Sequence, residues 1–181
     1  VGTGMENHSK YGHFIYTHDG NTTLFVNLFT PSRLVSNKFA VTQQTQFPYE
    51  PATTITIEVN MTRGMQFHLS GLADTAVKES YDRIKAAIQN NGFKMPVADL
   101  TVNLSPADIR KEGSGYDLPL AVGILAVNNK IDSSRLSEYM LVGEIGLDGK
   151  LQPVRGALPI AIRARKEKFK GLIVPRENIR E

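Results

Sequence analysis

Cysteine is absent from the 181 residues of this chain. Without it there is no disulfide framework, no thiolate zinc site and no cysteine nucleophile. Long apolar runs are also lacking, because none approaches the roughly 18 residues that a membrane-spanning helix needs. We therefore expect no membrane partner. Since no basic and apolar leader opens the chain, we also expect a cytoplasmic location.

The composition is that of a folded, globular chain. Hydrophobic residues make up 41% of the sequence and charged residues 22%, values near the average for globular proteins. The length predicts one domain or slightly more. The net charge is +3, and nearly all of the 21 Lys and Arg residues follow residue 60, so the second part of the chain carries the positive charge.

The first part of the chain is rich in strand patterns. Aromatic and β-branched residues dominate "YGHFIYTH" and "TTLFVNLF", and the intervening "HDGNTT" predicts a hairpin turn. The alternation in "FAVTQQTQF" suits a strand that completes the edge of a sheet. Residues 53–60, "TTITIEVN", predict a further strand with alternate residues on one face.

From residue 74 the hydrophobic period changes to that of helices. Asp74 is expected to cap a helix over 75–91, and Gly92 is expected to end it in a left-handed conformation. The remaining predicted elements alternate between strands and helices: a strand over 99–105, a helix capped by Asp117, two strands around Asp148-Gly149, a helix over 157–169 and a buried strand over 171–175. This alternation predicts a mixed α/β fold of the α+β class.

Five ordered blocks of sequence cover most of the chain after residue 53. They read "TTITIEVNMTRG", "GLADTAVKESYDRIKAAIQNNGFKMP", "VNLSPADIRKEGSGYDLPLAVGILA", "GEIGLDGKLQPVRGALP" and "LIVPREN". These blocks resemble the N-terminal domain of the Mg chelatase-like ATPases of the ComM (YifB) family. The resemblance implies that residues 53–181 form a Lon protease-like domain, with the fold also found in a ribosomal small-subunit domain 2. It also implies an AAA+ module beyond Glu181.

Residues 1–50 resemble a different family. The text from "GTGMENHSKYGHFIYTHDG" to "TQFPYEPATTITIE" is similar to the β-L-arabinofuranosidase glycoside hydrolases. Because "ATTITIE" suits both families, the joint between the two resemblances lies within Ala52–Val59. We therefore expect a β-rich segment over 1–52 that precedes a Lon-like domain over 53–181, truncated before its AAA+ module.

The resemblance to Lon directs attention to a serine–lysine pair. Proteolysis of this type needs a serine at the start of a helix and a lysine that takes its proton. In "RKEGSGYD", Lys111 matches the Lon pattern, but Gly115 occupies the serine position and Ser114 lies one place early. The lysine position, in "RGAL", holds Leu158, which accepts no proton. We therefore assign no catalytic residue, expect no enzymatic activity from this chain, and expect Ser114 to serve the turn.

Cofactor motifs are absent as well. The sequence has no G-x-x-x-x-G-K-[ST] loop to hold phosphates, so ATP and Mg are expected only in the missing AAA+ module and no cofactor in this chain. The resembled glycosidases use cysteines with zinc, and this chain has no cysteine. A small group of possible ligands fits no strong metal pattern, and we assign no metal site to it: Glu6, His8, His13 and His18.

Basic side chains crowd the last segment of the chain, and phosphate backbones are common partners of such a surface. The candidate DNA-binding residues are Arg155, Arg163, Arg165, Lys166, Lys168 and Lys170. The end of a solvent-facing helix explains the same charges through the helix dipole and solubility. The resemblance favours DNA, because ComM-like proteins are implicated in processing DNA during natural transformation as ring-shaped branch-migration motors.

The expected function is that of a non-catalytic accessory domain of a ComM-type AAA+ ATPase, which contacts DNA backbone or neighbouring subunits in a full-length homo-oligomer. Phe169 is the only aromatic residue in the basic helix, so backbone contact is favoured over base stacking. Two alternatives stay open. In the first, the chain is a fragment of a carbohydrate-active glycoside hydrolase. In the second, it is a scaffold for subunit assembly alone.

Overall fold

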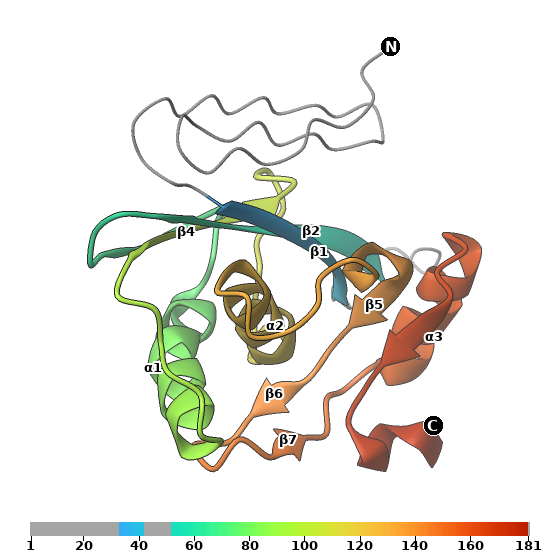
Figure 1. The fold of residues 1–181 in the computed structure, drawn as a ribbon. Helices are drawn as coiled ribbons and strands as arrows, with labels where there is room; N and C mark the ends of the chain where they lie inside the picture. The colour runs from blue at the N-terminus through green and yellow to red at the C-terminus, as the bar shows by residue number, and fades with distance from the viewer. Residues whose placement is uncertain (1–32, 42–51, 181) are drawn as a thin grey trace.

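The computed structural model describes residues 52–180 with their side chains and residues 33–41 as backbone. The expected "HDGNTT" hairpin and the group of Glu6 and three histidines lie outside these described residues. Within the described part, a six-stranded sheet forms one layer, with α1 and α2 beneath it and α3 at one side (Figure 1). The expected mixed α/β class is confirmed.

The sheet combines antiparallel and parallel neighbours. Its order is β3-β4-β2-β1-β5-β8, with β1–β2 and β2–β4 antiparallel and the other pairs parallel. The strands are β1 (Arg33–Val41), β2 (Thr53–Thr62), β3 (Phe67–Ser70), β4 (Asp99–Ser105), β5 (Tyr139–Leu141) and β8 (Gly171–Ile173). A separate hairpin pairs β6 (Glu144–Ile145) with β7 (Leu151–Gln152).

The strand from the front of the chain lies inside the sheet and not at its edge. The expectation for "FAVTQQTQF" was an edge strand, but β1 begins earlier, at Arg33, and ends at Val41. It pairs with β2 along its whole length, from Arg33 opposite Met61 to Val41 opposite Thr53, and with β5 on its other side. The sheet therefore includes a strand from before residue 52, although the two resemblances change near that point.

The core fills the space between the sheet and two helices. Alternate residues of β2 face inward, so Ile55, Ile57 and Val59 are fully buried. They pack with apolar residues of α1 (Thr75–Asn90) and α2 (Asp117–Val127). α2 is apolar on nearly all sides, which suits a helix enclosed between the sheet and α1. The hydrophobic pattern therefore explains why α1 and α2 pack beneath the sheet.

Several element boundaries differ from the sequence expectation. The edge strand β3 was not expected, because only four residues separate the turns on either side of it. The segment after residue 138 forms three short strands in place of two, although the turn at Asp148-Gly149 is confirmed between β6 and β7. α3 (Ala157–Lys166) stops before Phe169, where Lys168 takes a left-handed conformation. Two 3-10 helices, η1 (Leu136–Glu138) and η2 (Arg176–Arg180), complete the described elements.

The ends of α1 follow the expected capping pattern. The carboxylate of Asp74 accepts a hydrogen bond from the backbone N–H of Val77 at 2.8 Å, which satisfies one free donor of the first turn. Gly92 follows the helix with φ +79°, a conformation that other residues adopt at a cost. Both predictions are confirmed.

None of the helices in the described ranges combines the length and the apolar character that crossing a bilayer requires.

The turn between β3 and α1 offers a test of backbone packing. Gly71 has φ +102°, and a Cβ atom there meets the carbonyl oxygen of Leu104 at 2.2 Å. Gly92 also has positive φ, but a Cβ atom there meets nothing within 4 Å. We expect Gly71→Ala to lower the free energy of unfolding by at least about 2 kcal/mol and Gly92→Ala by about 1 kcal/mol. Urea denaturation measures both, and equal losses contradict this packing.

Candidate functional site

The loop that precedes α2 is tied to the start of α1. The backbone N–H of Lys111 donates to the carbonyl of Leu72 at 3.0 Å, and the carbonyl of Lys111 accepts from the N–H of Asp74 at 2.9 Å. The Asp74 carboxylate, which caps α1, also accepts from the N–H of Gly113 at 3.2 Å. These contacts hold the glycine-flanked Ser114 in a defined place at the entrance to α2.

Lys111 serves the loop from the inside. Its side chain is fully buried, and its Nζ donates a hydrogen bond to the carbonyl oxygen of Pro106. Burial lowers the pKa of this amine, and the nearby carboxylate of Asp108 opposes the shift only in part. The side chain of Lys111 thus ties the loop that precedes α2 to Pro106.

Ser114 has a carboxylate as its partner. Its Oγ donates a hydrogen bond to Oε2 of Glu144, the first residue of β6. Both side chains are half-buried. In a serine–lysine protease, a lysine amine takes the proton of the serine hydroxyl. Here the partner of the Ser114 hydroxyl is a carboxylate, and their hydrogen bond links the loop to β6.

The first residue of α2 carries the most enclosed carboxylate of the described chain. Asp117 has a side chain that is 0% exposed, and it binds Arg83 of α1 through two hydrogen bonds of 2.9 Å each. It also accepts from the backbone N–H of Ile145 in β6 at 3.1 Å. Burial raises the pKa of Asp117, and the hydrogen bonds from Arg83 and Ile145 oppose this shift.

The expected capping role of Asp117 is therefore wrong. The residue at the cap position of α2 is Tyr116, which makes no side-chain cap hydrogen bond, and Asp117 turns inward to α1 and β6. Its partner Arg83 was not singled out from the sequence. The signal was present, because Arg83 lies one turn from the buried Ser80 and one turn from the buried Ala87, on the inner side of α1.

The two positions of the Lon pair hold no reactive groups. Gly115 contributes only its backbone carbonyl, which accepts from the N–H of Gly143 at 3.1 Å. Leu158 lies in the first turn of α3 and is 52% exposed. Glycine and leucine side chains carry neither a hydroxyl nor an amine.

The candidate DNA-binding residues divide into two groups. Arg163 and Lys170 are engaged in ion pairs, with Glu167 at 2.6 Å and with Glu138 at 2.9 Å respectively. Arg163 and Glu167 both also bond the hydroxyl of Thr54, so this group joins α3 to β2. Bonds from Lys170 and Arg135 lower the pKa of Glu138. These two cations have structural partners.

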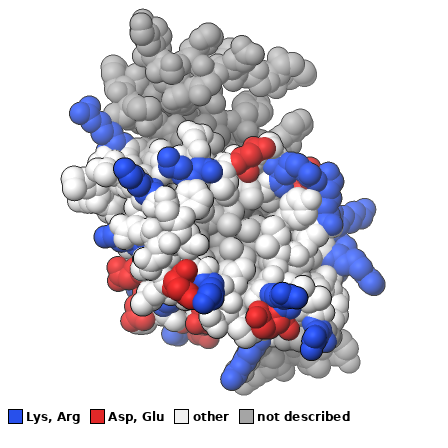
Figure 2. Space-filling model, turned by 60° about the horizontal axis from the view of Figure 1, so that its bottom comes forward, with Lys and Arg blue, Asp and Glu red and all other residues white. Residues whose placement is uncertain are grey.

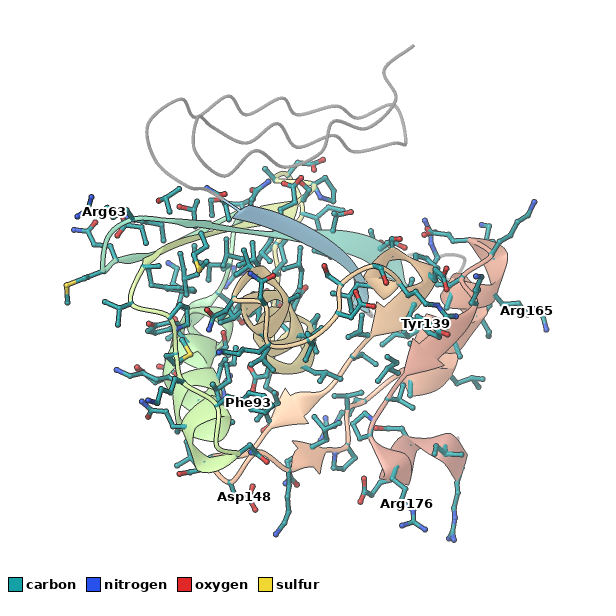
Figure 3. The ribbon with its side chains drawn as sticks, viewed as in Figure 1. Arg63, Phe93, Tyr139, Asp148, Arg165 and Arg176 are labelled. Carbon is teal, nitrogen blue, oxygen red and sulfur yellow. The ribbon has the colours of Figure 1, made fainter. Side chains whose placement is uncertain are left out.

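The exposed cations form what we call the α3 basic surface: Arg155, Arg165, Lys166, Lys168, Arg176 and Arg180. Figure 2 shows Lys and Arg side chains gathered on the right of the molecule, the side where α3 lies in Figure 1. Arg165 projects outward from α3, and Arg176 projects from the start of η2 (Figure 3). Four of the six candidate residues are thus exposed on or next to α3, and the exposed Arg176 and Arg180 lie on η2.

Within residues 33–41 and 52–180, no group of three or more His, Asp or Glu side chains is arranged to hold an ion.

Known proteins resemble most of the chain. The family described as "Subunit ChlI of Mg-chelatase" matches residues 57–178. Competence protein ComM of Haemophilus influenzae is 43% identical over 131 residues, 72% of this chain and 26% of that protein. Uncharacterized protein YifB of Escherichia coli is 43% identical over 128 residues, 70% of this chain and 25% of that protein. Lon protease 2 of Bacillus subtilis is 28% identical over 101 residues, 56% of this chain and 18% of that protein.

These likenesses bear on two of the expectations. The chain spans about a quarter of the length of ComM and YifB, the curated relatives it matches. The similarity to a Lon protease agrees with the mixed sheet and confirms the Lon-like fold. The family match begins at residue 57, so the glycoside hydrolase resemblance of residues 1–50 gains no support from it.

The buried ion pair yields a stability prediction. We expect Arg83→Ala to lower the free energy of unfolding by about 3–5 kcal/mol, because it leaves the enclosed Asp117 carboxylate without its cation. Arg135→Ala is the control, since it breaks an exposed Arg–Glu pair with Glu138 and is expected to lower the free energy of unfolding much less. Chemical denaturation of both variants measures the difference, and similar losses contradict the role given to Arg83.

Proposed function

Because the chain belongs to the ChlI-type Mg-chelatase family together with ComM and YifB, we propose that it is a non-catalytic, Lon-like accessory domain of an AAA+ ATPase. In this proposal the α3 basic surface contacts the backbone of DNA. ATP hydrolysis with Mg belongs to the remainder of a longer, cytoplasmic protein that assembles from identical subunits. This chain itself holds neither ATP nor a metal.

The polar cluster at the start of α2 supports the non-catalytic part. A serine nucleophile needs a base that takes its proton and a free approach for the substrate carbonyl. Here the Ser114 hydroxyl is bonded to Glu144, the Lys111 amine is buried against Pro106, and Leu158 stands where Lon-type proteases place lysine. Two other residues of this cluster, Arg83 and Asp117, hold α1, α2 and β6 together.

The observation that carries the DNA part is the gathering of exposed cations on one side of the domain. Residues from the β7–α3 connection, α3 and η2 contribute to it. Arg163 and Lys170 are set aside because carboxylates already pair with them. A surface of this kind attracts phosphates by releasing their counterions, without reading bases.

A DNA titration tests this proposal. We expect the chain to bind a fluorescently labelled duplex at low salt, and we expect Arg165→Gln/Lys168→Gln to weaken binding several-fold and to reduce the salt slope by about 1–2. Lys78→Gln/Lys85→Gln on α1 is the control, because it removes the same charge from another exposed helix face. Binding that is independent of salt, or equal loss in both double variants, contradicts a phosphate contact at α3.

Peptidase assays test the absence of catalysis. We expect no cleavage of an unfolded protein substrate above the buffer background, and the same background for Ser114→Ala, because the hydroxyl lacks an amine base. Fluorescent casein release over several hours provides the measurement. Cleavage by the wild-type chain that disappears in Ser114→Ala shows that the domain is an enzyme.

A further inference from the structure

The first two turns of α3 are apolar on every side. The six residues from Ala157 to Ile162 read "ALPIAI". A surface helix needs only one apolar stripe to pack on a core, and in α3 that inner stripe consists of Ala157, Ile160 and Ala164, all buried. The remaining apolar side chains of this segment, Leu158, Pro159, Ala161 and Ile162, are only partly buried or exposed.

Two of these extra side chains form a second stripe on the outer side. Leu158 is 52% exposed and Ile162 is 54% exposed, and their spacing of four residues places them one above the other on the helix. Arg165 continues the same line one turn later and points outward at the side of the molecule (Figure 3). Single exposed apolar residues are common on protein surfaces, but here two lie one turn apart on one helix face, so a partner that covers them removes adjoining apolar area from water.

The charge around the outer stripe is positive at both ends. Arg155 lies just before α3, and Arg165 and Lys168 lie at and beyond its end, all exposed. The acidic residue of this segment, Glu167, is bonded to Arg163 and Thr54 and therefore turns toward β2. A partner that covers the stripe meets aliphatic groups in the middle and cations at the ends.

DNA does not account for the middle of this surface. Aliphatic side chains donate no hydrogen bond to a phosphate and offer no ring on which a base stacks. An amphipathic protein helix suits both the apolar middle and the cationic ends of this surface. Its apolar face covers Leu158 and Ile162, and its flanking carboxylates pair with the cations.

We propose that Leu158 and Ile162, with Arg155 and Arg165 at either end, form a docking strip for an amphipathic helix of a protein partner whose apolar face is bordered by carboxylates. The strip is argued without the DNA contact proposed above, but it shares Arg165 with the α3 basic surface. Because Arg165 belongs to both surfaces, the helix and a duplex compete for the same side of α3.

A designed peptide tests the strip directly. The probe is a fluorescein-labelled helical peptide of about 18 residues with leucines along one face and glutamates beside them. We expect saturable binding at micromolar concentration in fluorescence anisotropy, and a loss of about ten-fold or more in Leu158→Ser/Ile162→Ser. Leu147→Ser is the matched control, because Leu147 is similarly exposed, at 61%, on the β6–β7 turn. Melting temperatures confirm that each variant is folded.

The choice of peptides separates charge from apolar contact. A peptide with lysine in place of glutamate is expected to bind about ten-fold more weakly, and a scrambled peptide of unchanged composition is expected not to bind. No saturable binding of the glutamate peptide, equal binding of the scrambled peptide, or an equal loss in Leu147→Ser overturns the proposal.

Two further measurements identify other occupants of the strip. If Leu158→Ser/Ile162→Ser weakens duplex binding as much as peptide binding, the strip is part of a DNA site and the proposal fails. If the wild-type chain self-associates in sedimentation and the same variant abolishes this association, the occupant is a second copy of the chain and the proposal fails. Loss of duplex binding alone concerns only the function proposed above, because peptide binding is then unchanged.

Discussion

The ion pair between Arg83 and Asp117 determines how the parts of this domain meet. A carboxylate that is wholly removed from water is stable only where hydrogen bonds and an opposite charge surround it. Arg83 supplies two bonds from α1, and the N–H of Ile145 supplies a third from β6. One buried side chain at the start of α2 therefore fixes the relative positions of three elements.

The polar groups at the start of α2 are engaged with one another. In this chain the start of α2 is occupied by groups that satisfy one another, with Ser114 on Glu144 and Asp117 on Arg83. Polar networks of this kind specify a unique arrangement of the elements around them. These hydrogen bonds join α1, α2 and β6 in a Lon-like fold.

Much of the fold follows from the sequence by simple physical rules. Alternation in "TTITIEVN", the Asp74 cap and the Gly92 stop predict β2 and α1 correctly, because burial and capping act over a few residues. The cap assignment of Asp117 was wrong because the sequence does not distinguish an aspartate that caps a helix from one that forms a buried ion pair. Only the fold shows that Arg83, 34 residues away, faces it. Which basic residues are engaged in ion pairs and hydrogen bonds likewise depends on partners from distant elements. Arg163, for example, bonds Thr54 of β2.

The place of β1 has a consequence for where this domain can be cut. The family match begins at residue 57, yet β1 ends at Val41 and bridges the antiparallel and parallel parts of the sheet. A chain trimmed to the matched region loses the strand between β2 and β5, and both of these then expose unsatisfied backbone donors and acceptors. Such open edges recruit strands from other molecules, so the segment outside the family boundary protects the domain from aggregation.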